Sequence, residues 1–306
     1  MKVAICIITL HRRDGLRRLL EGISSQTFQE IRPEVEVIVV DNDPLGSSKD
    51  VIDKIENDFT KIKYFIEDNK GIPYARNRSL READTNADYI VFIDDDEVPE
   101  ENWLEELLLA QKKYNADIVT GPVIPIFMEK PSDWILEGEF FSRRRYESGT
   151  SLKVAATNNT LVKKGIFDEI NRAFDINYAL TGGSDTHLFM DIYKRGYNII
   201  WADNAIVKEW IPRSRANKNW LLKRGYREGN VYSRCEIDIY RKKKVKYLRL
   251  LKACIKLCKN ILTFLLSIFQ SKANRVKCLR NITISAGEIV GVFDKRYNEY
   301  KNIHQV

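Results

Sequence analysis

The segment Tyr89–Pro99, YIVFIDDDEVP, joins an apolar run to the longest run of acidic residues in the chain. Five apolar or aromatic residues lead directly into Asp94, Asp95, Asp96 and Glu97. Four like charges in a row repel one another, so a plain surface loop explains them poorly. The apolar run predicts a buried strand, and the acids after it predict a polar site at one edge of a sheet.

Similar apolar runs recur along the first two hundred residues and alternate with amphipathic stretches. The expected elements are strands at 3–9, 35–41, 63–67, 89–94 and 116–127 and helices that begin near Asp14, Pro73, Pro99 and Asp185. Because most of the apolar runs are continuous rather than alternating, both faces of these strands should be covered. The pattern predicts an α/β fold with a mostly parallel central sheet and helices on both faces.

The charge of the chain is divided unevenly along its 306 residues. Residues 1–200 carry 26 Lys and Arg against 35 Asp and Glu, whereas residues 201–306 carry 24 against 8. A basic region of this kind suits an anionic partner. Together with the end of the α/β pattern near Arg215, the charge predicts two parts, an α/β domain at 1–215 and a basic helical region at 216–306.

Polar residues follow three of the expected strands, at Thr9, at Asp41 and at Asp94 with the acids after it. The carboxyl ends of parallel strands meet at one edge of a sheet, so these side chains should lie close together. The loop after the first strand, TLHRRDG, contains neither GxGxxG nor GxxxxGK[ST]. That absence argues against a dinucleotide-dependent dehydrogenase and against a P-loop ATPase.

A hard divalent cation, Mg²⁺ or Mn²⁺, would relieve the repulsion between Asp94 and Asp96, because both ions prefer oxygen ligands. An alternative is that the acids stabilise the N-terminus of the helix expected near Pro99. That alternative suits Glu97 and Glu100 well, and it explains acids packed against the end of a strand less well.

The chain resembles family 2 glycosyltransferases with the GT-A fold. Four segments carry the resemblance, in this order: ICIITLHRRDGLRRLLEGISSQ, VEVIVVDND, NKGIPYARNRSLREA and YIVFIDDDEVPEENWLEELL. The likeness continues through TGGSDTHLFMDIYKRGYNIIWADNAIVKEW and covers about the first 215 residues. An acidic triplet alone would be weak support for this family, whereas several motifs in the family's order and spacing are specific for it. The resemblance implies metal-dependent transfer of a sugar, with inversion, from a nucleotide donor, most simply a UDP-sugar.

The resemblance also implies the residues that bind the donor. Thr9 and Asp41 match positions that hold the base and ribose, and Arg76 matches a residue near the phosphates. Arg12 ends the segment that reads Thr-Tyr-Asn-Arg in the family and Thr-Leu-His-Arg here. Gly182 and Gly183 would let the backbone approach the donor sugar closely.

Further roles concern the metal and the chemistry. Asp94 and Asp96 match the DXD motif, in which the last Asp contacts the metal and the first lies towards the ribose, and Asp95 is a candidate contact to ribose or donor sugar. Asp185 matches the general base, although Ser184 stands where relatives carry Glu, and a helix N-cap is the alternative role for Asp185. Some relatives have a metal-binding His near Glu209, and whether Glu209 replaces it is open.

The segment 241–272, RKKKVKYLRLLKACIKLCKNILTFLLSIFQSK, predicts an amphipathic helix at about 244–270. Its uninterrupted apolar runs are too short to span a bilayer. One interpretation is a helix lying in the membrane interface and attracted to anionic lipid. The other is a helix that packs its apolar face on the catalytic domain and leaves its basic stripe in water. Nucleic acid is not an expected partner, because aromatic residues are not interleaved with the basic ones.

Five cysteines without a CxxC pair or a zinc-site spacing favour a reducing, cytoplasmic environment. The combined prediction is an inverting, hexosyltransferase-type enzyme, peripheral at the inner face of the cell membrane. It would transfer a sugar to a hydroxyl of a lipid-linked or oligosaccharide acceptor in surface polysaccharide synthesis. The alternatives are a sugar nucleotidyltransferase, whose usual glycine-rich basic signature near the N-terminus is missing, and a non-catalytic membrane-bound nucleotide-sugar binder.

Overall fold

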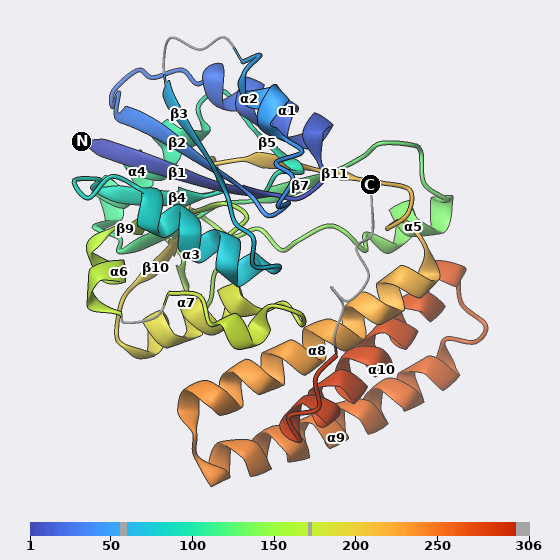
Figure 1. Ribbon diagram of the computed structural model, residues 1–306. Coiled ribbons are helices and arrows are strands. Elements are labelled where there is room, and N and C mark those ends of the chain that lie inside the picture. Colours follow the sequence, from blue (N-terminus) through green and yellow to red (C-terminus); the bar gives the residue numbers. More distant parts are fainter. Residues whose placement is uncertain (56–59, 171–172, 298–306) are drawn as a thin grey trace.

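The computed structural model describes residues 1–55, 60–170 and 173–297. Within these residues the chain forms a large sheet, a small sheet and a group of three long C-terminal helices (Figure 1). The large sheet has the strand order β3-β2-β1-β4-β9-β6-β10-β8. Its strands are β1 (Lys2–Thr9), β2 (Glu34–Asp41), β3 (Thr60–Ile66), β4 (Tyr89–Phe92), β6 (Ile118–Thr120), β8 (Ser151–Leu152), β9 (Thr160–Lys163) and β10 (Ile199–Trp201).

The predicted, mostly parallel sheet is confirmed. Strand β1 pairs in parallel with β2 and β4, β2 pairs in parallel with β3, and β6 pairs in parallel with β10. Two antiparallel strands, β9 between β4 and β6, and β8 at the edge beside β10, were not predicted.

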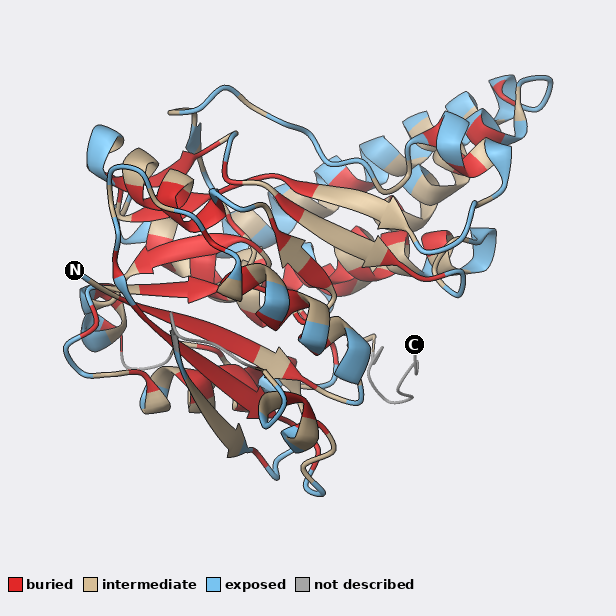
Figure 2. Ribbon diagram, turned by 90° about the horizontal axis from the view of Figure 1, so that it is seen from above, coloured by how far each residue is buried: buried red, intermediate tan, exposed pale blue. Residues whose placement is uncertain are grey.

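Helices cover both faces of this sheet, as the continuous apolar runs predict (Figure 1). The helices are α1 (Arg13–Ser24), α2 (Lys49–Ile52), α3 (Ile72–Glu82), α4 (Trp103–Tyr114), α5 (Asp133–Gly138), α6 (Gly165–Glu169), α7 (Ser184–Lys194), α8 (Lys218–Tyr240), α9 (Lys243–Leu266) and α10 (Lys272–Val292), with a 3₁₀ turn at Ile176–Tyr178. Alternate residues of β1 point to opposite faces. Ile5 and Ile7 pack with α1 and α4, while Ala4 and Cys6 pack with α3 and α7. Figure 2 shows the resulting burial of the strands.

The small sheet shows that the predicted start of a helix at Pro99 is wrong. It has the order β5-β11-β7, with β5 at Glu97–Pro99, β11 at Val207–Ile211 and β7 at Val123–Phe127. The helix expected to open at Pro99 begins at Trp103 instead, and Pro99 ends β5. Glu97 is therefore a buried strand residue rather than a charge at a helix start. Its strand is held by β11, more than a hundred residues later, which no local pattern reveals.

Helices α8 and α10 approach each other through glycines. A Cβ added at Gly229 of α8 would lie 2.0 Å from the carbonyl oxygen of Ile284, and one at Gly287 of α10 would lie 2.0 Å from that of Tyr226. Gly225 and Gly291 make similar approaches one turn away. The two backbones therefore touch where side chains normally separate helices.

Helix α9 packs on the other two through its polar stripe. Arg249 pairs with Glu236, Lys256 Nζ donates to Glu288 at 2.8 Å, and Asn260 donates to Ser285 at 3.0 Å. The interpretation in which the apolar face packs inward is therefore wrong, because the half-buried Glu236 of α8 and the buried Glu288 of α10 attract the basic side of α9. None of the helices in the described ranges is both long and apolar enough to cross a membrane. The division of the chain at residue 215 stays a prediction.

The close approach of α8 and α10 predicts that one methyl group added at a glycine between them lowers the stability of the protein. Gly229→Ala should destabilise the protein by about 2 kcal/mol, because the added Cβ must push α10 away from α8. The matched control is Gly165→Ala in α6, where no atom lies within 4 Å of an added Cβ. Urea unfolding followed by circular dichroism measures both variants. Equal stability of the two variants would contradict the close approach.

Candidate functional site

A cavity of about 920 Å³ lies at the carboxyl ends of β1 and β4, bounded also by β11, α7, α8 and α10. Almost all the predicted site residues line it, although they come from distant parts of the chain. They are Thr9, Arg12, Arg76, Asp94, Asp95, Asp96, Gly182, Gly183, Asp185 and Glu209. The strand-end argument thus identified a real convergence of polar groups.

Asp41 is the one predicted site residue that does not line the cavity. Its carboxylate is fully buried and accepts hydrogen bonds from the Tyr64 hydroxyl and the Ser48 backbone N–H, both at 2.9 Å. It holds the loop that follows β2, and the next residue, Asn42, reaches the cavity in its place. A nucleotide-binding role for Asp41 stays a prediction.

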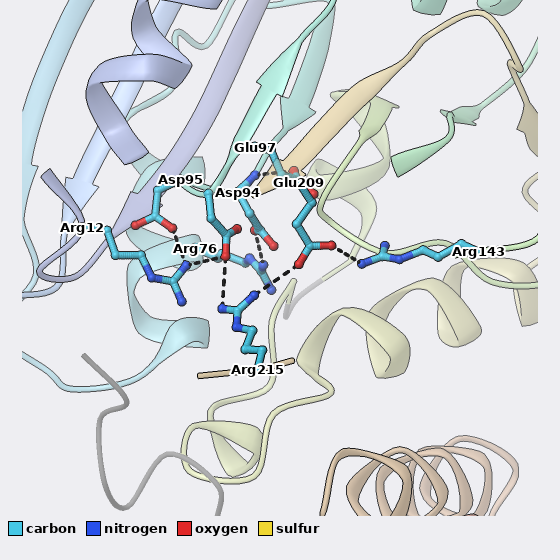
Figure 3. Close-up of polar contacts among 9 residues, drawn as sticks. Arg12, Arg76, Asp94, Asp95, Glu97, Arg143, Glu209 and Arg215 are labelled. Atoms are coloured by element: carbon cyan, nitrogen blue, oxygen red, sulfur yellow. Dashed lines mark hydrogen bonds and ion pairs between the residues drawn. The ribbon is translucent and has the colours of Figure 1, made fainter. Parts of the chain in front are cut away.

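Four arginines hold the acids at the floor of the cavity (Figure 3). Arg12 Nη1 donates to Asp95 at 2.8 Å and to Asp96 at 3.0 Å, and Arg76 Nη2 donates to Asp94 at 3.0 Å. Because each pair lies partly out of water, these charge-assisted bonds are stronger than surface ion pairs.

The other two arginines reach the acids from loops on the far side. Arg215 bridges Asp96 and Glu209, at 3.1 and 3.2 Å, and Arg143 donates to the other oxygen of Glu209 at 3.0 Å (Figure 3). Arg215 lies four residues after the end of β11, and Arg143 lies five residues after the end of α5. Sequence reasoning missed both, because ArgArgArg at 143–145 and the segment after β11 have no periodicity that marks them as site residues.

Glu97 and Glu209 stand directly opposite each other in the pairing of β5 with β11. Like charges opposite one another destabilise a sheet, so the pair is costly unless a ligand or a proton relieves it. Burial raises the pKa of Glu97 well above its usual range, and Asp94 and Glu209 add to the effect. The Glu97 carboxylate also accepts the Asp94 backbone N–H at 3.0 Å, which holds the turn between β4 and β5.

The pKa values of two neighbouring carboxyls, Asp94 and Asp95, are raised as well. Burial raises the pKa of Asp95 to about 6, against the lowering effect of Arg12. Desolvation likewise raises the pKa of Asp94, with a contribution from the charges of Asp96 and Asp185. Perturbed carboxyl pKa values that gather in one cavity mark it as a candidate functional site.

Asp185 is the second residue of α7, and its side chain lines the cavity. The helix N-cap is Gly183, so neither Asp185 nor Ser184 occupies the capping position. Gly182 and Gly183 both have positive φ, at 72° and 92°. A Cβ on Gly183 would lie 2.1 Å from Val231 of α8, so close packing against that helix, besides any ligand, requires this glycine.

The C-terminal helices supply a basic wall that the sequence analysis did not assign to the site. Trp220 and Glu228 of α8 line the cavity there, together with the basic residues Arg224, Arg227, Lys277 and Arg280 of α8 and α10. Glu228 pairs with Arg224 at 3.1 Å and with Arg280 at 2.8 Å. Lys277 has no ion-pair partner among the described residues. The wall therefore has more positive than negative charge and suits an anionic ligand.

The donor set at the acidic end fits a hard divalent cation. Asp94, Asp96 and Glu209 all line the cavity. Among the described residues, the three metal-ligating side chains whose ligand atoms lie close together are Asp175, His187 and Asp238 instead, so the acids here suit an ion held by one or two carboxylates. Mg²⁺ and Mn²⁺ commonly take one or two protein carboxylates and complete their coordination with phosphate oxygens and water. Burial raises the pKa of Asp94, and a cation bound beside this carboxyl would offset that effect by favouring the ionised form.

Comparison with known sequences identifies relatives of the chain. Residues 4–170 match the profile described as glycosyl transferase family 2. Succinoglycan biosynthesis protein ExoM of Rhizobium meliloti is 28% identical over 228 residues, covering 74% of this chain and 73% of that protein. A shorter match, 28% over 98 residues and about 30% of each chain, is to the GalNAc(5)-diNAcBac-PP-undecaprenol beta-1,3-glucosyltransferase of Campylobacter jejuni.

Solved structures share the fold. Staphylococcus aureus TarS, crystallised with UDP-GlcNAc, has a TM-score of 0.56 at 12% identity and covers 94% of this chain and 91% of its own. GalNAc-T7 with UDP, GalNAc and Mn²⁺ has a TM-score of 0.56 at 12% identity, over 78% of this chain and 48% of that one. The likeness to TarS confirms the predicted GT-A fold.

The raised pKa of Asp95 predicts a pH-dependent stability. Between pH 4 and 6 the folded state keeps a proton on Asp95 that the unfolded state has lost, so this residue lowers the free energy of unfolding as pH rises. Asp95→Asn removes the effect. Its stability relative to the parent should therefore increase by up to about 3 kcal/mol from pH 4 to pH 7. Urea unfolding with a chelator present measures the difference, and a difference that is constant with pH would contradict the assignment.

Proposed function

The chain belongs to glycosyl transferase family 2, and from this premise we propose that it transfers a sugar from a UDP-sugar, with inversion, to a hydroxyl of a lipid-linked glycan acceptor. The observation that carries the proposal is that Asp185 and the pair Asp94 and Asp96 line one cavity from separate elements. Inverting transfer needs a base on one side of the sugar and a stabilised leaving group on the other. The family match disfavours the first alternative, a sugar nucleotidyltransferase.

The donor lies at the acidic end of the cavity in this proposal. Thr9, Arg12, Asp95 and the backbone at Gly182 and Gly183 contact the nucleotide and the donor sugar. Asp41 acts behind them, by holding the loop that brings Asn42 to the cavity. Asp94 and Asp96 hold Mg²⁺ or Mn²⁺, with Glu209 as a further candidate ligand. When bound, the cation neutralises charge on the departing diphosphate. The complexes of the structural neighbours with UDP-GlcNAc and with UDP and Mn²⁺ support this choice of ligands.

The arginines have a second role once donor binds. Guanidinium groups bind phosphate in the same paired geometry that they use with carboxylates. Arg76 and Arg215, which now neutralise Asp94 and Asp96, can turn to the diphosphate while those acids hold the cation. The apo protein thereby keeps its acids neutralised without losing them as ligands.

Asp185 accepts the proton of the acceptor hydroxyl in the proposed reaction. It stands on the helix side of the cavity, in the first turn of α7, while the metal-binding acids follow β4. A carboxylate there can take the proton as the hydroxyl oxygen attacks the anomeric carbon from the face opposite the diphosphate.

The acceptor lies towards the basic wall. A lipid diphosphate would be attracted by Arg224, Lys277 and Arg280, which line the cavity from α8 and α10. The Campylobacter relative is named for such an acceptor, and ExoM is a succinoglycan biosynthesis protein, which supports a role in polysaccharide synthesis. An acceptor of this kind would hold the enzyme at the inner face of the cell membrane, as a peripheral cytoplasmic protein.

The first test addresses the base. With a panel of UDP-sugars, a divalent cation and acceptor, the parent should release UDP, and Asp185→Asn should do so roughly 100- to 10,000-fold more slowly. Binding of UDP should be unchanged, because the amide keeps the shape of the side chain. Asp191→Asn is the matched control: it lies on the same helix, pairs with Arg195 and does not line the cavity. A protein that binds UDP-sugars but never releases UDP would favour the non-catalytic binder.

A second test addresses the cation. Asp96→Asn should abolish the UDP-dependent binding of Mn²⁺ in calorimetry, and a chelator should stop UDP release by the parent until Mn²⁺ or Mg²⁺ is restored. Asp50→Asn, at an exposed carboxylate paired with Arg13, is the control and should bind Mn²⁺ like the parent. Full activity in the chelator would refute metal dependence.

A further inference from the structure

The largest group of exposed apolar side chains lies on α9 and the turn after it. Of the twenty large hydrophobic residues that are exposed in the described part of the chain, ten fall between Tyr247 and Phe269. They are Tyr247, Leu248, Leu251, Ile255, Ile261, Leu262, Leu265, Leu266, Ile268 and Phe269. Phe269 is 97% exposed, and Leu266 is 76% exposed. A patch of this kind on a folded protein marks an interaction surface.

The direction of this face follows from the packing of the helix. At 100° per residue the exposed residues on α9 occupy one side, and Arg249, Lys256 and Asn260 occupy the opposite side. Those polar residues are bonded to α8 and α10, so the helix cannot turn its apolar side inward without breaking ion pairs with Glu236 and Glu288. In Figure 1, α9 is the helix of the bundle farthest from the large sheet. The apolar face is therefore directed away from the protein.

The charge around this face identifies its partner. Residues 239–287 contain thirteen Lys and Arg and no Asp or Glu. Exposed lysines at 242–244, 252 and 259 adjoin the apolar residues. A second copy of the same face would meet identical positive charge, which disfavours self-association, whereas anionic lipid headgroups would attract it. We infer that the apolar face of α9, with its adjoining lysines, docks on the surface of an anionic lipid bilayer.

This inference rests on the proposed function only for the identity of the acceptor. Lys272, at the start of α10, lies over the Trp134 ring of α5 at 4.8 Å, so the end of the bundle that carries Leu266 and Phe269 is close to α5. The last residue of α5, Gly138, lines the cavity. Docking on the membrane would thus bring the cavity close to lipid-linked acceptors at the bilayer surface.

Vesicle binding tests the surface directly. The full chain should sediment with phosphatidylglycerol vesicles and much less with phosphatidylcholine vesicles. Leu262→Asp should weaken this binding at least about ten-fold, because a charge replaces an inserted leucine. Leu45→Asp is the matched control, since Leu45 is 90% exposed on a different surface outside the cavity. Circular dichroism checks that both variants are folded. Lys252→Glu with Lys259→Glu should weaken binding to phosphatidylglycerol alone.

Several outcomes would overturn the inference. Unchanged binding of Leu262→Asp would do so, as would equal binding of the parent to both lipids. A dimer in light scattering that Leu262→Asp converts to a monomer would assign the face to self-association instead. Vesicle binding needs neither donor nor acceptor. A protein that binds vesicles through α9 and never releases UDP would therefore refute the proposed function and leave this inference standing.

Discussion

Mutual repulsion among five carboxylates, gathered at one edge of two sheets, is the constraint on which the rest of the structure depends. Two strands of the small sheet place Glu97 against Glu209, and the turn after β4 adds three aspartates. Leaving such charges unpaired out of water would cost more than a domain's stability allows. The structure offsets the cost with guanidinium groups from four distant segments, at Arg12, Arg76, Arg143 and Arg215. The same acids that hold these loops together are the ones suited to a divalent cation.

Much of this arrangement could be predicted from local sequence. Continuous apolar runs identified the parallel strands, and the residues at their ends identified Thr9, Asp94 and Asp96 as neighbours. What the pattern lacked was information about pairing between remote segments. Strand β5 has three residues and exists only because β11 pairs with it, so the local sequence suggests for Glu97 a charge at a helix start instead. Arg143 and Arg215 reach the acids through the conformations of irregular loops, which no periodicity describes.

The orientation of the amphipathic helix α9 also depends on remote parts of the chain. Its sequence predicts two faces, but not which one the protein covers. A stretch with thirteen basic residues and no acid can neutralise itself only with acids from elsewhere in the fold. Glu236 of α8 and Glu288 of α10 are those acids, and they face Arg249 and Lys256. The electrostatic attraction orients the polar stripe inward, so the hydrophobic side is the one left exposed, the reverse of the arrangement usual for surface helices.

The helix bundle also takes part in the site. Gly183 at the start of α7 has no room for a Cβ beside Val231 of α8, and Arg234 of α8 donates to the Thr181 hydroxyl at 3.3 Å. The turn that presents Asp185 therefore lies against α8. That helix is in backbone contact with α10 through Gly229, and α9 is ion-paired to both. The surface inferred to meet lipid and the carboxylate proposed as the base thus belong to one packed unit, because α8 contacts both the turn before α7 and the two helices that follow it.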